Sequence, residues 1–272
     1  MMLRLTVSIL VTLSRTVYIR IQAPIISLAD ILPERFLRWC FKVNVLYSST
    51  RGFYPFLRWS IASLLEHNQV EKLYLLAEDD EVPLDVNCPV EVINYSGQKS
   101  FAPDCPNIHT LWNIIPLVYV LIPELVPAEK VIYLDMDTVI LEDLRPLWEL
   151  DLTGKWGAWC NEAKSTYRPY GEKYYNGGVA VMNLAQMRED RVTETLVRML
   201  NREEFLYSGQ DALNAILTEE KVEELPVRYN ESFCCGYTDR PAIIHYAGYI
   251  DWWYNQSMPR WQYLEKYKRF SI

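Results

Sequence analysis

Short apolar runs alternate along this chain with longer segments whose apolar residues recur every three or four positions. The first pair is an apolar run at 43–48 followed by a helical pattern at 54–67. Further strands are predicted at 72–77, 90–94, 130–134, 156–160, 179–183 and 243–245. Helices are predicted for an apolar stretch that ends near Pro123 and for 210–217. This alternation is typical of an α/β domain with a mixed, mostly parallel sheet flanked by helices.

The length of 272 residues suits one large domain, which we place at 41–272. Residues 1–40 are treated as an N-terminal extension of uncertain role. From about Asp251 the chain is rich in Trp, Tyr, Lys and Arg. We expect this tail to form a packing helix, with contact to an acceptor or to a membrane surface as the alternatives.

Charge and cysteine content narrow the function classes. With 27 Lys and Arg against 35 Asp and Glu, the net charge of −8 argues against a nucleic-acid-binding protein. An acidic protein that binds an anionic ligand needs a local positive charge, which a metal ion can supply. The six cysteines form no Cys-x-x-Cys pair, so we predict reduced thiols, a cytoplasmic location and no thiolate zinc site. Peripheral attachment at the inner face of the membrane is the alternative location.

Two carboxylates, Asp135 and Asp137, directly follow the predicted strand 130–134. Open α/β sheets bind ligands at the carboxyl ends of their strands. Two carboxylates about 4 Å apart repel by roughly 4 kcal/mol at an effective dielectric constant of about 20, so a cation or a shared proton is needed. A solvated turn is the purely structural alternative.

A third candidate ligand is His245, one of only three histidines, at the end of the strand predicted at 243–245. Two carboxylates and one imidazole suit Mn²⁺ or Mg²⁺, and the nitrogen favours Mn²⁺. The sequence therefore predicts a divalent metal site of Asp135, Asp137 and His245.

Four segments occur in this order along the chain: 131–137 (Val-Ile-Tyr-Leu-Asp-Met-Asp), 175–184 (Tyr-Asn-Gly-Gly-Val-Ala-Val-Met-Asn-Leu), 210–214 (Gln-Asp-Ala-Leu-Asn) and 245–248 (His-Tyr-Ala-Gly). Together they resemble the motifs of glycosyltransferase family 8, which includes lipopolysaccharide galactosyl- and glucosyltransferases and glycogenin. The resemblance implies a GT-A fold, a UDP-sugar donor, Mn²⁺, a glycan or glycolipid acceptor and retention of the anomeric configuration.

The resemblance also implies roles for individual residues. The metal ligands match Asp135, Asp137 and His245. Gln210 matches the residue that faces the anomeric carbon, and Asp211 is its acidic neighbour in the catalytic segment. The donor-binding positions match Ser48, Ser49, Thr50, Asp135, Met136, Asn176, Gly177 and Gly248. Without the resemblance, Asn176-Gly177 is equally typical of a turn, and Gln210-Asp211 of a polar helix start.

Some positions depart from the family pattern. Asp251 stands where the last motif commonly has the Lys that touches the diphosphate, and no Lys or Arg occurs from Ser100 to Glu129. Gly209 and Thr50 each replace a usual Asp. The basic residues that could restore the missing charge are Lys99, Arg168 and Lys173.

Two other functions fit parts of the sequence. The order Asp135-Met-Asp137-Thr138 is also similar to the first motif of haloacid-dehalogenase-type phosphatases, in which Asp135 would be the nucleophile, but no later Gly-Asp-x-x-x-Asp follows. The missing basic residues would also fit a non-catalytic sugar-nucleotide-binding module.

Overall fold

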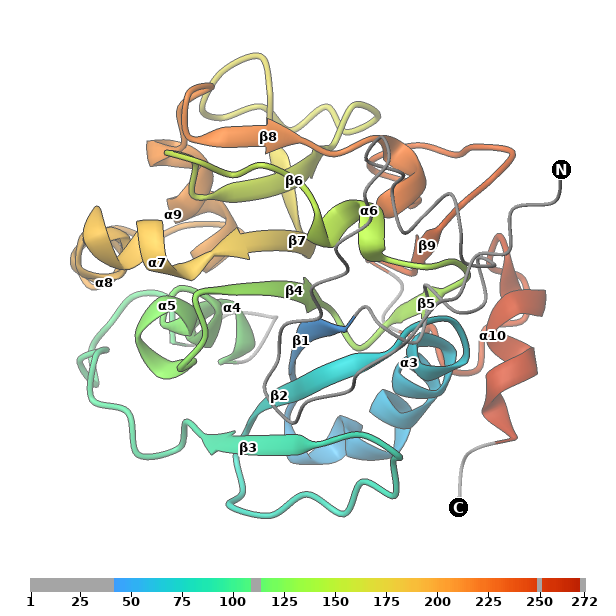
Figure 1. Ribbon diagram of the computed structural model, residues 1–272. Coiled ribbons are helices and arrows are strands. Elements are labelled where there is room, and N and C mark those ends of the chain that lie inside the picture. Colours follow the sequence, from blue (N-terminus) through green and yellow to red (C-terminus); the bar gives the residue numbers. More distant parts are fainter. Residues whose placement is uncertain (1–41, 109–113, 249–250, 270–272) are drawn as a thin grey trace, which may run out of the picture. The chain divides into compact units, whose positions relative to one another are not determined.

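The computed structural model describes residues 42–108, 114–248 and 251–269. Within these ranges the chain forms a seven-stranded sheet (Figure 1). These residues belong to a compact unit at Phe41–Ile272, and the predicted extension 1–40 lies outside the described residues. The strand order is β3-β2-β1-β4-β7-β6-β8. Its strands are β1 Val43–Ser48, β2 Val70–Ala77, β3 Val90–Asn94, β4 Lys130–Leu134, β6 Gly157–Asn161, β7 Tyr175–Asn183 and β8 Val222–Glu224.

Most of the described strand pairs are parallel. β1 pairs in parallel with β2 and β4, β2 with β3, and β6 with β8, whereas β7 runs antiparallel to both of its neighbours, β4 and β6. The predicted mixed, mostly parallel sheet is therefore confirmed.

Helices cover both faces of the sheet because its central strands are apolar on both sides. In β4, Val131 and Tyr133 pack with α4, α5, α7, α8 and α9, whereas Ile132 and Leu134 pack in a second cluster with α3 and α6. This two-sided burial explains why 130–134 is a continuous apolar run rather than an alternating one. The helices are α3 Tyr54–His67, α4 Ile115–Tyr119, α5 Ile122–Leu125, α6 Arg145–Trp148, α7 Leu184–Glu189, α8 Val192–Leu200 and α9 Ser208–Ile216, with short 3-10 turns η1 Arg51–Phe53 and η2 Val227–Tyr229.

A separate two-stranded sheet brings late residues to the carboxyl end of β4. β5 Thr138–Ile140 pairs antiparallel with β9 Ile243–His245, and the register sets Thr138 opposite His245. The Tyr246 N–H also donates to the Asp137 carbonyl at 2.9 Å. This pairing holds His245 beside the two carboxylates, although more than 100 residues separate them in sequence.

The tail forms α10 Trp261–Lys268, as predicted for a packing helix. Leu264 and Tyr267 are buried in a cluster with Trp59 of α3 and Trp252. None of the helices in the described ranges has the length and apolarity needed to cross a membrane.

Two predictions about local structure were wrong. β7 begins at Tyr175 rather than at 179, so Asn176 and Gly177 lie within a strand and do not form a turn. The apolar stretch before Pro123 forms two short helices, α4 and α5, because each has a proline in its first turn, where it begins a new helix.

Candidate active site

The two aspartates lie in the short connection between β4 and β5. The Asp135 N–H donates to the Gly178 carbonyl of β7 at 2.7 Å, and the Thr138 hydroxyl donates to the Asp135 carbonyl at 2.7 Å. The Tyr133 hydroxyl donates to the Asp135 carboxylate at 2.6 Å. These contacts fix the backbone of the turn and the carboxylate of Asp135.

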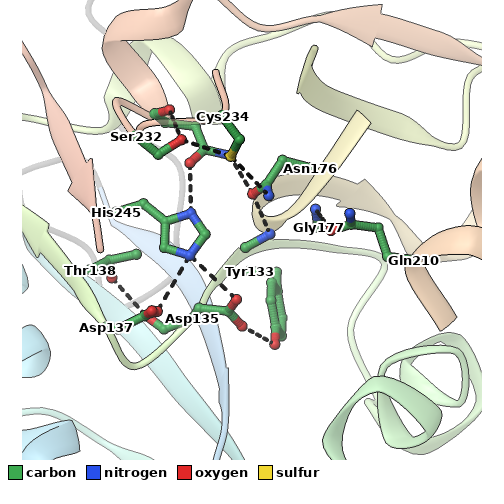
Figure 2. Close-up of polar contacts among 12 residues, drawn as sticks. Tyr133, Asp135, Asp137, Thr138, Asn176, Gly177, Gln210, Ser232, Cys234 and His245 are labelled. Atoms are coloured by element: carbon green, nitrogen blue, oxygen red, sulfur yellow. Dashed lines mark hydrogen bonds and ion pairs between the residues drawn. The ribbon is translucent and has the colours of Figure 1, made fainter. Parts of the chain in front are cut away.

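His245 completes a group of three metal-ligating side chains (Figure 2). Its Nε2 atom lies 3.4 Å from Oδ1 of Asp137 and 3.6 Å from Oδ2 of Asp135. Two ligand atoms bound at about 2.1 Å to one ion can lie at most about 4.2 Å apart, so both separations fit a shared divalent cation. The side chain of His245 is 4% exposed, that of Asp137 18% and that of Asp135 36%. The group is therefore open to a ligand on its Asp135 side.

The electrostatics of this group favour a cation. Burial raises the pKa of Asp135, and repulsion by Asp137 raises it further. Burial lowers the pKa of His245, but attraction by Asp137 and Asp135 outweighs this effect and raises the pKa to about 9. Both shifts arise from two carboxylates held close together in a partly desolvated place, an arrangement that a divalent cation stabilises.

Gly178 makes room for this group. A Cβ atom at Gly178 would lie 2.1 Å from Cε1 of His245 and 2.7 Å from Oδ2 of Asp135. Any side chain there would push the imidazole and the carboxylate apart. No role was predicted for Gly178 from the sequence, in which the glycine pair 177–178 was the only signal.

Gln210, at the start of α9, is joined to β7. Its Oε1 accepts a hydrogen bond from the Gly177 N–H at 2.8 Å, and its Nε2 donates to the Tyr174 hydroxyl at 3.0 Å. Nε2 also lies 3.3 Å from the Glu162 carboxylate. The predicted residues Gln210 and Gly177 are thus in direct contact, close to Asn176 (Figure 2).

Asp211 is fully buried and accepts three hydrogen bonds. They come from the hydroxyls of Tyr174 at 2.5 Å and Tyr167 at 2.9 Å, and from the Tyr207 N–H at 3.0 Å. Asp211 therefore supports Gln210 through Tyr174, and its predicted catalytic role stays a prediction.

The segment Ser48–Thr50, predicted to bind the donor, begins at the last residue of β1, next to β4, and continues as a loop. Ser48 is hydrogen-bonded to the Tyr133 hydroxyl at 2.7 Å, and the Ser49 hydroxyl donates to the Thr50 carbonyl at 3.2 Å. Ser49 also lies 3.7 Å from the sulfur of Met136. The loop and the aspartate turn therefore share one edge of the sheet, while donor binding by these residues stays a prediction.

Gly248, three residues after His245, adopts a φ of +75°, which favours glycine. The Phe233 ring covers it so closely that a Cβ atom there would lie 2.8 Å from the ring. Its predicted donor contact is untested.

Two buried polar residues of this site were missed. Glu162, which directly follows β6, accepts from the Asn176 Nδ2 at 2.9 Å. Asn230, after η2, lies 2.8 Å from Nδ1 of His245 through its Oδ1 and donates to Asn176 at 2.9 Å. Glu162 comes shortly after the predicted strand 156–160, but nothing in the sequence distinguishes either residue from a surface polar residue.

Of the three basic residues considered for the missing positive charge, Arg168 forms a hydrogen bond with the backbone of Glu162. Its guanidinium donates to the Glu162 carbonyl at 2.6 Å. Lys173 instead forms an ion pair with Glu224 at 2.9 Å.

Comparisons with known proteins agree with this geometry. The model of the family "Glycosyl transferase family 8" matches residues 44–256. A "Putative glycosyltransferase" of Haemophilus influenzae is 26% identical over 247 residues, which cover 79% of this chain and 74% of that protein. The "Lipopolysaccharide glucosyltransferase WaaO" of Escherichia coli is 23% identical over 258 residues, which cover 81% of this chain and 74% of that protein.

A solved structure of the galactosyltransferase LgtC, described as a complex with donor and acceptor sugar analogs, has the same fold. It superposes with a TM-score of 0.65 at 17% identity, covering 84% of this chain and 95% of that one. The domain therefore has the GT-A fold. Because the family model matches residues 44–256, which are most of the chain, this chain belongs to glycosyltransferase family 8.

Proposed function

We propose that this glycosyltransferase moves a hexose from a UDP-sugar to a glycan or glycolipid acceptor, in a reaction that needs a divalent metal and retains the anomeric configuration. The observation that carries the proposal is the group of Asp135, Asp137 and His245, which lies against Gly178 of β7, next to the Gly177 whose N–H donates to Gln210. Mn²⁺ is the ion we favour and Mg²⁺ the alternative, because the ligands combine two oxygens with one nitrogen.

The three side chains are suited to holding a cation against a diphosphate. A divalent cation bound there would supply Lewis-acid stabilisation of the charge that grows on the leaving UDP. The chain's own part is to fix the ligands, and the backbone contacts of Asp135 and the pairing of β5 with β9 do this. Ser48 and Ser49, at the carboxyl end of β1, lie at the same edge, and this supports their proposed contacts with the nucleoside of the donor.

Gln210 is the side chain proposed to face the anomeric carbon. An amide is a poor nucleophile, so we assign it electrostatic support of an oxocarbenium-like sugar while the acceptor hydroxyl attacks from the same face. The orientation of its amide is fixed, because the amide oxygen accepts a hydrogen bond from the Gly177 N–H and the amide nitrogen donates to the Glu162 carboxylate.

The acceptor is proposed from the relatives alone. WaaO is named as a lipopolysaccharide glucosyltransferase, which supports a lipopolysaccharide-like or other cell-surface glycan and a role in lipopolysaccharide biosynthesis. The five cysteines in the described ranges are free thiols, which supports the proposed cytoplasmic location. Peripheral membrane contact through the tail remains the alternative.

Replacement of Gln210 by alanine should lower kcat for UDP release about 10- to 100-fold, because support of the developing positive charge is lost while the metal ligands remain. Affinity for UDP with Mn²⁺ should stay within about threefold of wild type. Steady-state kinetics and calorimetry measure the two quantities, with Gln186→Ala on α7 as a control. An unchanged kcat would remove Gln210 from the proposed mechanism.

A donor panel tests the whole proposal. Purified protein is incubated with UDP-glucose, UDP-galactose or UDP-N-acetylglucosamine and Mn²⁺, and UDP release and the anomeric configuration of the product are measured. Release from one donor with retained configuration supports the proposal and names the sugar. Binding of UDP and Mn²⁺ without release, even with glycan acceptors, would favour the non-catalytic binding module.

A further inference from the structure

A line of hydrogen bonds connects the metal-ligating group to the residues around Gln210. From the metal side it runs from His245 to Asn230 at 2.8 Å, from Asn230 to Asn176 at 2.9 Å, and from Asn176 to Glu162 at 2.9 Å. Glu162 in turn lies 3.3 Å from the Gln210 amide. His245, Asn230, Asn176 and Glu162 are all buried.

The chemistry of its neighbours fixes the orientation of the Asn176 side chain. The Glu162 carboxylate can only accept hydrogen bonds when ionised, so it must face the Nδ2 of Asn176. The Gly178 N–H can only donate, and it donates to the Oδ1 of Asn176 at 3.0 Å. An amide flip at Asn176 would set donor against donor and acceptor against acceptor.

The orientation of Asn176 then dictates that of Asn230. Because Oδ1 of Asn176 is an acceptor, Asn230 must direct its Nδ2 towards it. The Oδ1 of Asn230 is therefore left to face Nδ1 of His245. An amide oxygen cannot donate, so Nδ1 of His245 must carry the proton in this hydrogen bond.

We infer that Asn230 is a positioning residue that fixes the tautomer of His245. In the neutral imidazole, the form that binds a metal, a proton on Nδ1 leaves the lone pair of Nε2 directed to the space shared with Asp135 and Asp137. Asn176, one of the proposed donor-binding residues, sets the orientation of Asn230. Asn176 and the metal ligand His245 are therefore joined by hydrogen bonds through Asn230. This inference rests on the proposed metal-dependent function.

Two substitutions of Asn230 separate its two hydrogen bonds. Asn230→Asp keeps an acceptor for Nδ1 of His245 but loses the donor to Asn176. Asn230→Ala loses both. Removing the hydrogen-bonding partner of a metal-bound histidine typically lowers metal affinity 10- to 100-fold. We expect a loss of about this size for Asn230→Ala and less than about threefold for Asn230→Asp.

The control is Asn68→Ala, which removes another buried asparagine that uses both ends of its amide. Asn68 donates to the carbonyls of Leu64 and Glu142, each at 3.2 Å, and accepts from the Leu144 N–H at 2.7 Å. It should lower the melting temperature as Asn230→Ala does, and it should leave Mn²⁺ affinity unchanged.

The experiment measures Mn²⁺ affinity by electron paramagnetic resonance and the tautomer of His245 by ¹⁵N NMR of the histidine-labelled full chain at saturating Mg²⁺. Only three histidines are present, and His245→Gln assigns the signals. Wild type and Asn230→Asp should show a proton on Nδ1, and Asn230→Ala should lose this pattern. The KM for the sugar donor should rise about five- to tenfold in Asn230→Asp, because Asn176 loses a hydrogen bond.

The inference is overturned if folded Asn230→Ala binds Mn²⁺ as wild type does, or if wild-type His245 carries its proton on Nε2. UDP release is measured in the same samples. Loss of Mn²⁺ affinity in Asn230→Ala, when wild type turns over no UDP-sugar, would support the positioning role and contradict only the proposed function.

Discussion

Replacement of Asp137 with asparagine is expected to lower the rate of metal-dependent UDP release by at least about 1000-fold. This change removes one of two anionic ligands that hold the cation, and a factor of 1000 corresponds to about 4 kcal/mol of transition-state stabilisation. Asparagine keeps the size of the aspartate side chain, and the hydrogen bond from Tyr246 to the backbone carbonyl at this position does not involve the carboxylate. The fold should therefore survive, and circular dichroism would verify this.

Asp151→Asn is the matched control, because this exposed aspartate accepts its hydrogen bonds from Thr153 in a surface turn. It should release UDP at the wild-type rate. If Asp137→Asn keeps more than about a tenth of the wild-type rate with Mn²⁺, Asp137 is not a metal ligand in turnover.

Gly178→Ala should lower Mn²⁺ affinity by more than about 100-fold, although all three ligating residues are still present in the chain. The new methyl group would overlap the His245 ring and the Asp135 carboxylate, at 2.1 and 2.7 Å. The ring would have to leave the space that it shares with the two aspartates. Isothermal titration calorimetry with Mn²⁺ measures the effect.

Gly97→Ala is the control for this substitution, because a Cβ atom there meets nothing within 4 Å. Mn²⁺ affinity is compared at a temperature at which circular dichroism shows both variants folded. Unchanged affinity in folded Gly178→Ala would mean that the cation does not use the closed arrangement of His245 and Asp135.

Much of this fold could be predicted from sequence because its strands are marked by local patterns. The run 130–134 is apolar on both faces, so β4 was found with its observed bounds, and the aspartates after it were placed at the ligand edge. The bounds of α3 and β9 were also as predicted. In each case the spacing of apolar residues shows which side chains are buried, and this burial determines whether the segment is a strand or a helix.

The start of β7 was missed because its first residues lack the usual strand character. Asn176, Gly177 and Gly178 have low strand propensity, and they are held in β7 by contacts from distant segments. Asn176 pairs with Cys160 of β6, and Gln210 of α9 accepts from the Gly177 N–H. Tertiary contacts thus outweigh local propensity at the residues that form the site.

The polar support of the site could not be predicted at all. Asn230 and Glu162 are ordinary polar residues in sequence. The bridge between Glu231 and Ile244 brings Asn230 to His245, and the pairing of β6 with β7 brings Glu162 to Asn176. Their roles depend on the direction of single hydrogen bonds. Such directions become visible only when all partners of each amide are known.

The most direct test of the account measures UDP release by the wild-type protein after its metal has been removed with EDTA and Mn²⁺ has been added back. Release from one UDP-sugar should stop with EDTA and return as Mn²⁺ is restored. Release that continues unchanged in EDTA, or a protein that binds neither UDP nor Mn²⁺, would contradict the proposal that Asp135, Asp137 and His245 hold the ion that this transferase uses.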